Sequence, residues 1–282
     1  MGQGRALLIA GALASGSAGA AEADRLVELI NAYRSGPQTC EGRQIGPVGP
    51  LAPQAVLARA ENPGRTDGLD AALKRAGYSA AQLQWIVVSG PANATGAMAL
   101  LTQRYCRPLL SAQFADIGIS RAGDTWRIVL ARPLLSRDLG DWRTAGREIL
   151  QLTNAARAQP RTCGEHRFRA AAPLQWNDKL AAAAVAHSRD MATHNDLSHK
   201  GSDGRTVGDR AVREGYSWNR IGENIATGQG SPGEVVASWL ASPHHCSNIM
   251  EPAFAEMGVA YVANPKSDTV IYWTQVFGRT GR

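Results

Sequence analysis

The chain has 282 residues, of which 44% are hydrophobic and 19% are charged, a composition typical of soluble globular proteins that argues against an intrinsically disordered chain. The length suits one large domain or two domains of roughly 100–150 residues each. The 30 Lys and Arg residues exceed the 24 Asp and Glu residues, so the formal net charge is +6, but the sequence contains no long basic run. A solvated basic surface is therefore favoured over a nucleic-acid-binding surface, and we expect no nucleic acid as a partner.

The first residues have the pattern of a secretory signal peptide. Arg5 precedes an apolar stretch over residues 6–14 that is too short to span a bilayer, and the small-x-small motifs at 18–20 and 21–23 resemble cleavage sites. Residues 1–20 are predicted to be removed, and a frayed cytosolic N-terminus is the alternative. The mature chain would have no transmembrane anchor and would be secreted, either to the periplasm or outside the cell.

The chain contains a weak internal repeat. Asn31, Cys40 and Pro50 each have an identical residue 123 positions later, and further identical pairs follow in the same order at offsets of 138 and 140. The growing offset is typical of loop-length differences between two copies of one fold. The matched pairs are Asn31 with Asn154, Cys40 with Cys163, Pro50 with Pro173, Tyr78 with Tyr216, and Cys106 with Cys246.

The repeat predicts the disulfides. Four cysteines allow three pairings, but each copy holds one cysteine near its start and one in its second half. We therefore expect the bridges Cys40–Cys106 and Cys163–Cys246, each contributing roughly 2–4 kcal/mol to stability. The chain has no CxxC motif, which disfavours a cysteine-type zinc site. A bridged Cys246 cannot act as a nucleophile beside His245.

Hydrophobic periodicity and breaker residues predict helices and strands in both copies. In the second copy, the helix that begins at Asn177 or Asp178 carries His187 on its apolar face, where a core role is favoured over a ligand role. The first copy is predicted to have helices over 24–35 and 96–105 and strands over 117–120 and 125–130. The second copy is predicted to have helices over 143–158, from 177 or 178 to about 195, over 210–215 and over 233–242, and strands over 256–262 and 269–277.

These elements predict an α+β fold in which helices cover both faces of antiparallel strands. The expected organisation is a first domain over 24–131, a linker over 132–143 and a second domain over 144–282.

Three residues of the second copy are candidates for chemistry. His199, Glu223 and His245 together offer two imidazole nitrogens and a carboxylate, which suit either a divalent metal or acid–base chemistry. Their separations of 24 and 22 residues match no local metal motif, and each residue taken alone would more often be structural or solvent-facing.

The motifs around these residues resemble a bacterial secreted CAP domain, of the superfamily of cysteine-rich secretory proteins, antigen 5 and plant pathogenesis-related proteins, also called SCP-like. The resemblance covers about residues 145–280 and implies an α-β-α sandwich with a central cleft that takes zinc in some members. The motifs are Leu152-Thr-Asn-Ala-Ala-Arg157, Leu174-Gln-Trp-Asn177, Leu197-Ser-His199, Gly222-Glu-Asn-Ile-Ala226, Ser242-Pro-His-His245 and Tyr272-Trp-Thr-Gln-Val-Phe277.

Carried over by motif, the two cleft histidines of the family are His199 and His245, and its GEN glutamate is Glu223. The second glutamate of eukaryotic members is replaced by Ser242, which weakens the acidic half of the site; Asp203 is a candidate to compensate. His244 is either an auxiliary ligand or simply exposed, and the exposed position is favoured.

By the same offsets, the first copy has Trp85 where the second has Glu223, and Tyr105 where the second has His245. It also lacks the stretch equivalent to 194–199. The first copy is therefore interpreted as a shortened, degenerate CAP-like domain that acts as a scaffold or binding surface.

The resemblance favours a non-enzymatic binding module for an unknown protein, lipid or cell-envelope ligand. The alternative is a zinc-dependent hydrolase or peptidase, with Glu223 as general base in the same cleft. A third hypothesis is a purely structural protein that has lost its site.

Overall fold

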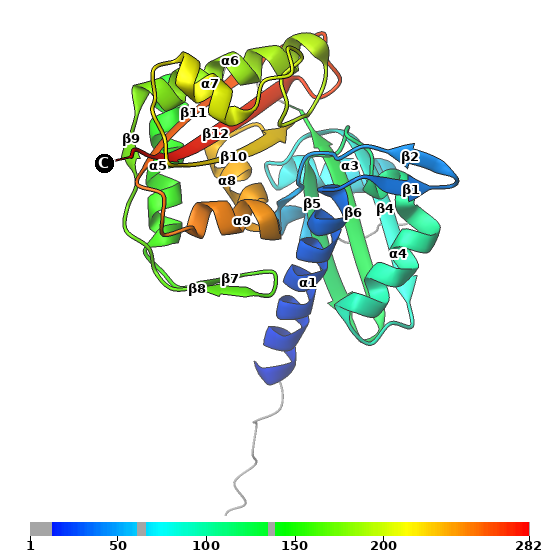
Figure 1. Cartoon of the computed structure of the whole chain (residues 1–282). Helices are drawn as coiled ribbons and strands as arrows, with labels where there is room; N and C mark the ends of the chain where they lie inside the picture. The colour runs from blue at the N-terminus through cyan, green and yellow to red at the C-terminus, as the bar shows by residue number, and fades with distance from the viewer. Residues whose placement is uncertain (1–12, 61–65, 135–138, 282) are drawn as a thin grey trace, which may run out of the picture.

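The computed structural model describes residues 13–60, 66–134 and 139–281. Residues 1–12 of the predicted signal peptide lie outside them. Two four-stranded sheets, one from each half of the chain, are each covered by helices on both faces (Figure 1). In the described residues, no helix is both long enough and apolar enough to cross a bilayer.

The second half forms a sheet of order β10-β12-β11-β9, in which only β9 runs parallel to its neighbour. The Asn177 side chain caps helix α6 by accepting from the backbone N–H groups of Lys179 and Leu180, and Asn195 in the left-handed region (φ 51°) ends it. The elements are α5 (Trp142–Arg157), β7 (Arg161–Cys163), β8 (His166–Phe168), β9 (Gln175–Trp176), α6 (Asp178–His194), α7 (Val207–Arg213), β10 (Arg220–Thr227), α8 (Pro232–Leu240), α9 (Pro243–Met250), β11 (Glu256–Ala263) and β12 (Ile271–Arg279).

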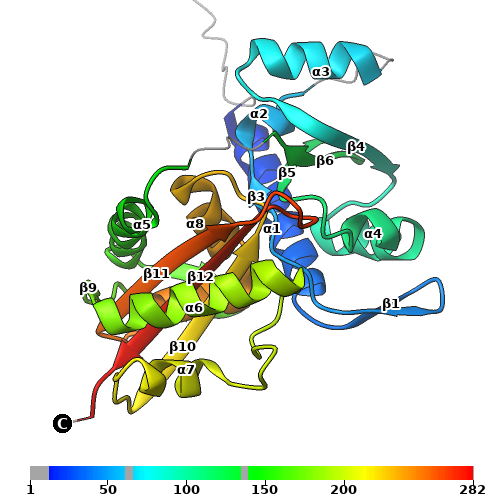
Figure 2. The same ribbon diagram turned by 90° about the horizontal axis from the view of Figure 1, so that it is seen from above.

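Helices α6 and α7 cover one face of this sheet, and α5, α8 and α9 lie on the opposite side (Figures 1 and 2). Helix α6 approaches β11 so closely that a Cβ atom at Gly258 would lie 2.0 Å from the backbone nitrogen of Ala181. A glycine is therefore required at this position. On the other face, Trp239, Trp273 and Phe277 are buried in one large apolar cluster.

The first half has a sheet of order β3-β5-β6-β4, which matches the second sheet position for position, including the single parallel pair. Trp85 on β4 pairs with Val129 on β6, and Glu223 on β10 pairs with Val276 on β12. Trp85 therefore occupies the position in the first sheet that Glu223 occupies in the second. The elements are α1 (Leu13–Arg34), β1 (Gln38–Cys40), β2 (Arg43–Ile45), β3 (Ala52–Pro53), α2 (Ala55–Ala58), α3 (Thr66–Arg75), β4 (Ala80–Ser89), α4 (Ala94–Leu109), β5 (Asp116–Ala122) and β6 (Thr125–Pro133).

One buried arginine in each half joins distant segments by the same hydrogen bonds. Arg34 and Arg157 are each the last residue of a helix and are fully buried. Their guanidinium groups donate to four backbone carbonyls each, so the charge is satisfied without a carboxylate partner. The acceptors are Gly49, Leu109, Ser111 and Phe114 for Arg34, and Ala172, Ile249, Glu251 and Phe254 for Arg157.

Both predicted disulfides are confirmed. Cys40 is bonded to Cys106 and Cys163 to Cys246, with Cα–Cα distances of 5.7 and 5.6 Å. Each bridge ties a short hairpin near the start of its half, β1–β2 or β7–β8, to a helix of the second part of that half.

The two halves are joined by buried polar bonds. The side chain of Gln229 is fully buried and donates to the Pro50 carbonyl at 2.9 Å. The side chain of Asn31 donates to the Ala241 carbonyl at 3.1 Å, and Gly49 packs directly against Thr227. Because unpaired buried amides would be costly, these bonds hold the halves in one arrangement.

Several predicted boundaries were wrong. The helix expected over 233–242 ends at Leu240, and a further helix, α9, begins at Pro243, because proline is tolerated in a first helical turn. The helix expected over 210–215 is α7, which begins at Val207. The linker expected over 132–143 overlaps β6, which runs to Pro133, and α5, which begins at Trp142; residues 135–138 lie outside the described part of the chain.

A buried carboxyl in the first half predicts a pH-dependent stability. Asp116 is fully buried, accepts a hydrogen bond from the Tyr78 hydroxyl at 2.7 Å, and has its pKa raised to about 7, mainly by burial. The unfolded chain releases this proton near pH 4. The contribution of Asp116 is therefore present below about pH 4 and is lost as the pH rises to about 7.

We expect the Asp116→Asn variant to lack this decline, which amounts to at most about 4 kcal/mol of unfolding free energy. Urea unfolding at a series of pH values measures it. The control is Asp70→Asn, which removes an exposed carboxylate paired with Lys74. The difference in unfolding free energy between Asp116→Asn and the parent should therefore change with pH. A constant difference from about pH 4 to 7 would contradict the assignment.

Candidate functional site

Glu223 is the centre of the site. It lies on β10 with its side chain only 2% exposed, on the sheet face covered by α6 and α7. His199 Nδ1–H donates to its Oε1 at 2.9 Å, and Arg210 Nη2 donates to its Oε2 at 2.6 Å. Both carboxylate oxygens are therefore engaged, and the negative charge is compensated by a buried guanidinium.

Arg210 also holds the segment that carries His199. Its guanidinium donates to the carbonyls of Arg205 and His199, at 2.9 and 3.1 Å. His199 is thus positioned by its own backbone and by its ring, although its side chain is 60% exposed. The free Nε2 of the ring is the atom that can meet a ligand.

His187 is a core residue, as its position on the apolar face of the predicted helix indicated. It is 1% exposed on α6, and its Nε2–H donates to the Ser198 carbonyl at 2.8 Å. Burial lowers its pKa, so the ring is neutral at physiological pH. Its Nε2 lies 3.8 Å from Glu223 Oε1, beyond hydrogen-bonding distance.

His245 lies in the first turn of α9 and is largely buried. Its Nδ1 is hydrogen-bonded with the Ser242 hydroxyl at 2.9 Å. Burial lowers the pKa of His245 to about 3, helped by His199 and His244 nearby. The imidazole is therefore neutral at any physiological pH, and Ser242 fixes the orientation of its ring.

These side chains line a cavity of about 740 Å³ to which both halves contribute. His199, Glu223 and His245 line it from the second half. Residues 46–50 of the first half, named here the wall segment, line it together with the end of α1. The wall segment is held by hydrogen bonds from the Val48 amide to the Arg34 carbonyl and from Arg34 Nε to the Gly49 carbonyl. Pro47, Val48, Leu197 and Ile225 add apolar surface to the cavity.

The auxiliary residues expected from the sequence occupy different places. His244 is exposed, as favoured, and lines the cavity. Ser242 is fully buried and contacts His245. Asp203 is exposed, is ion-paired with Arg205, and is not among the residues that line the cavity, so the structure gives it no compensating role beside Glu223.

The donor set does not fit a zinc site as it stands. In His199 and His245, Nδ1 is hydrogen-bonded, to Glu223 and Ser242 respectively, and Nε2 is available, as is usual for a metal-binding histidine whose other ring nitrogen is held in place. Glu223, however, is paired at both oxygens. Within the described ranges, no group of three or more His, Cys, Asp or Glu side chains is placed to hold a metal ion.

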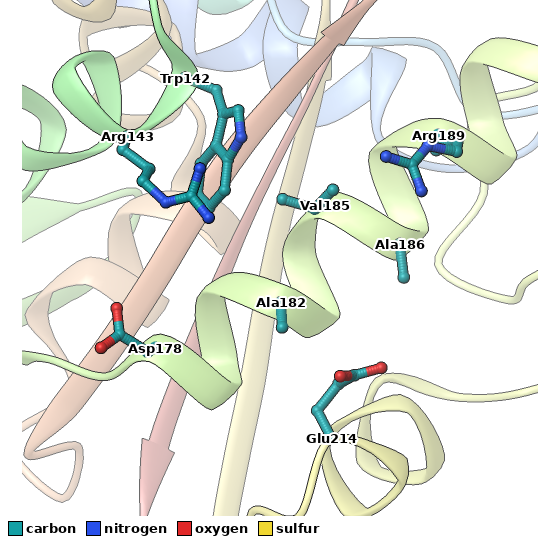
Figure 3. A pocket seen from close by; sticks show the side chains of 8 residues that line it. All are labelled: Trp142, Arg143, Asp178, Ala182, Val185, Ala186, Arg189 and Glu214. Atoms are coloured by element: carbon teal, nitrogen blue, oxygen red, sulfur yellow. The ribbon is translucent and has the colours of Figure 1, made fainter.

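A second cavity, of about 550 Å³, lies beside α6 (Figure 3). Ala182, Val185 and Ala186 line it on α6, and the guanidinium of Arg143 stacks on the Trp142 ring at 4.4 Å. Its lining has the charged side chains of Arg143, Asp178, Arg189 and Glu214 but no histidine, so the cleft remains the candidate site.

Two features of the site were not found from the sequence. Arg210 is a single basic residue in a short helix, with no local signal that it turns inward. The wall segment is a Gly- and Pro-rich stretch 149 or more residues before His199 in the chain, and only tertiary packing brings the two together.

The Arg210–Glu223 pair predicts a large effect on stability. Replacing Arg210 by Met leaves the Glu223 charge buried without its guanidinium, which should lower the free energy of unfolding by about 3–5 kcal/mol. Thermal and urea unfolding measure the change. The control Arg205→Met breaks an exposed ion pair and should leave the midpoint almost unchanged; equal midpoints for the two variants would contradict the assigned role.

Comparison with known proteins places the second half in a family. Residues 150–277 match the model of the cysteine-rich secretory protein family, called CAP. The uncharacterized protein YkwD of Bacillus subtilis strain 168 is 35% identical over 131 residues, which cover 46% of each chain. The uncharacterized membrane protein YlbC of the same organism is 28% identical over 116 residues, or 41% of this chain and 31% of YlbC. The chain thus spans less than half the length of these curated relatives.

Among solved structures, an extracellular protein containing a SCP domain from Bacillus anthracis strain Ames is similar, with 25% identity and a TM-score of 0.42. The match covers 56% of this chain and 53% of that one. Residues 150–277, with the α-β-α arrangement described above, thus match the CAP domain of the cysteine-rich secretory protein family.

Proposed function

We propose that this protein is a secreted, non-enzymatic binding protein whose ligand site is the cleft at His199, Glu223 and His245, completed by the wall segment. The observation that carries the proposal is the cavity of about 740 Å³ that both halves line. This volume is within the range of ligand-binding pockets. Two disulfides are consistent with an oxidising compartment.

The chemistry of the lining defines the kind of ligand that fits. One side presents the imidazoles of His199 and His245 and the Asn248 amide, and the other presents Pro47, Val48 and Pro50. A ligand with an apolar body and a polar group that hydrogen-bonds to imidazole nitrogens satisfies both sides. Because Glu223 is compensated by Arg210, the floor of the cleft does not demand a cationic ligand.

The hydrolase alternative is less well supported by this geometry. A general base must lie within hydrogen-bonding reach of the attacking water, but the Glu223 side chain is only 2% exposed. In Glu223, Oε1 accepts from His199 and Oε2 accepts from Arg210. The carboxylate is thus placed as an orienting group for His199.

The first half is proposed to be a degenerate CAP-like copy over residues 24–131 that serves as scaffold and as wall of the cleft. Support comes from the matching strand order, the matched Arg34 and Arg157 hydrogen bonds, and the loss of the polar cleft residues. At the equivalent positions, Trp85 packs in an apolar cluster and Tyr105 packs against the core of the first half.

The cavity predicts binding of a small amphiphilic probe. Anilinonaphthalenesulfonate should give a saturable increase in fluorescence with the full chain. Val48→Trp should remove most of this increase, because the indole fills the cavity from the wall segment. The control Val212→Trp adds the same side chain at a position that is 60% exposed and outside the cleft. An unchanged signal in Val48→Trp, with parent-like unfolding, would count against the cleft as the binding site.

The paired state of Glu223 predicts weak metal binding. Titration calorimetry of the metal-free protein with micromolar zinc should give no more heat than the His199→Ala/His245→Ala double variant. Saturable binding in the parent that disappears in the double variant would show instead that zinc displaces Arg210 or recruits a further ligand, and would restore the metal-dependent hypotheses.

A further inference from the structure

The first sheet has an uncovered area at the place where the second sheet has its cleft. Helix α6 has 17 residues and packs on both β11 and β12, whereas its counterpart α2 has four residues. Helices α2 and α3 lie over one end of the first sheet (Figure 2), where Leu69 and Leu73 pack in one cluster with Leu57 and Val129. Beyond this cluster, Val87 on the same face is 42% exposed in the described structure.

The open area forms a recess of about 560 Å³, named here the arginine recess. Val87, Arg127 and Ser120 lie side by side on β4, β6 and β5. Trp85 is two residues before Val87 on the same face, and Arg59 follows α2 at its rim. By strand register, Trp85 and Val87 hold the positions of Glu223 and Ile225.

Among the described residues, the lining of the recess offers hydrogen-bond donors and no carboxylate. The guanidinium groups of Arg59 and Arg127 make no ion pair or hydrogen bond with any described residue, although Arg127 is half-buried. Trp85 Nε1 is buried and also has no partner in the described part of the chain. Unpaired donors of this kind favour an anionic partner, and guanidinium groups suit carboxylates in particular.

The position of β4 favours a peptide over other anions. Strand β4 ends the sheet, and no described strand pairs with its outer edge. An extended peptide added at this edge gains main-chain hydrogen bonds and places every second side chain on the face of the recess. Val87, which is 42% exposed, supplies an apolar contact between that peptide and Arg127.

We propose that the arginine recess and the outer edge of β4 bind an extended acidic peptide segment of a partner protein. The site is separate from the cleft and does not depend on the function proposed for the cleft.

Fluorescence anisotropy of the full chain with a labelled peptide of alternating Glu and Thr tests the proposal. We expect saturable binding that weakens with salt, and no binding of the matching Lys–Thr peptide. Arg59→Gln/Arg127→Gln should weaken binding by about tenfold or more. The control Arg43→Gln/Arg104→Gln removes the same charge from two other exposed arginines and should keep binding within about twofold of the parent. Arg127→Lys, which keeps the charge but loses the planar fork, should fall between the parent and the double variant.

Three results would overturn the proposal: no saturable peptide binding to the parent, an equal loss in both double variants, or binding of alginate or inorganic phosphate in place of the peptide with the same dependence on Arg59 and Arg127. Circular dichroism and thermal unfolding confirm that each variant is folded. Arg59 and Arg127 make no side-chain bond to the described residues, so both substitutions should be tolerated.

Discussion

The arrangement of the cleft depends on one buried guanidinium, that of Arg34. Burial lowers its pKa to about 9, yet it remains charged at neutral pH because four carbonyl oxygens accept its hydrogen bonds. One of these carbonyls belongs to Gly49, and the Arg34 carbonyl in turn accepts from Val48. The last residue of α1 therefore fixes the wall segment, and Gln229 of the second half fixes it from the other side through Pro50.

Each half uses a buried arginine to hold a loop, but only one of the two loops borders the cleft. Arg157 fixes the loop before β9 as Arg34 fixes the wall segment, but that loop does not border a cleft of the first half. In the second half, a long α6 and the Arg210–Glu223 pair create a buried polar floor. In the first half, a short α2 and Trp85 leave an open, basic face. The two sheets, which have matching strand orders, thus carry a cleft in the second half and a basic surface in the first half.

Much of the second half could be predicted from the sequence, because its signals are local. Asn177 as a cap and the breaks at Asn195 and Pro160 are signals of this kind. The resemblance to CAP domains located His199, Glu223 and His245, and the repeat predicted both disulfides.

What could not be predicted depends on contacts between distant segments. Nothing near Arg210 indicates that it pairs with Glu223, and nothing in residues 46–50 indicates that they border His199. Helix α9 was not predicted, because a proline such as Pro243 is compatible with both the end of one helix and the first turn of the next. Asp203 was a candidate to compensate for the replaced glutamate, but it is exposed, is paired with Arg205 and does not line the cavity.

The central claim is that the two halves form one fixed binding unit. A disulfide between Gly49→Cys and Thr227→Cys tests it directly, since a Cβ atom at Gly49 would lie 3.0 Å from Thr227 Oγ1. Mass spectrometry after oxidation should show nearly complete cross-linking, with fluorescent-probe binding equal in the oxidised and reduced protein. If the cross-link does not form, or if probe binding is lost only when the cross-link forms, the wall segment is not fixed and the two halves separate.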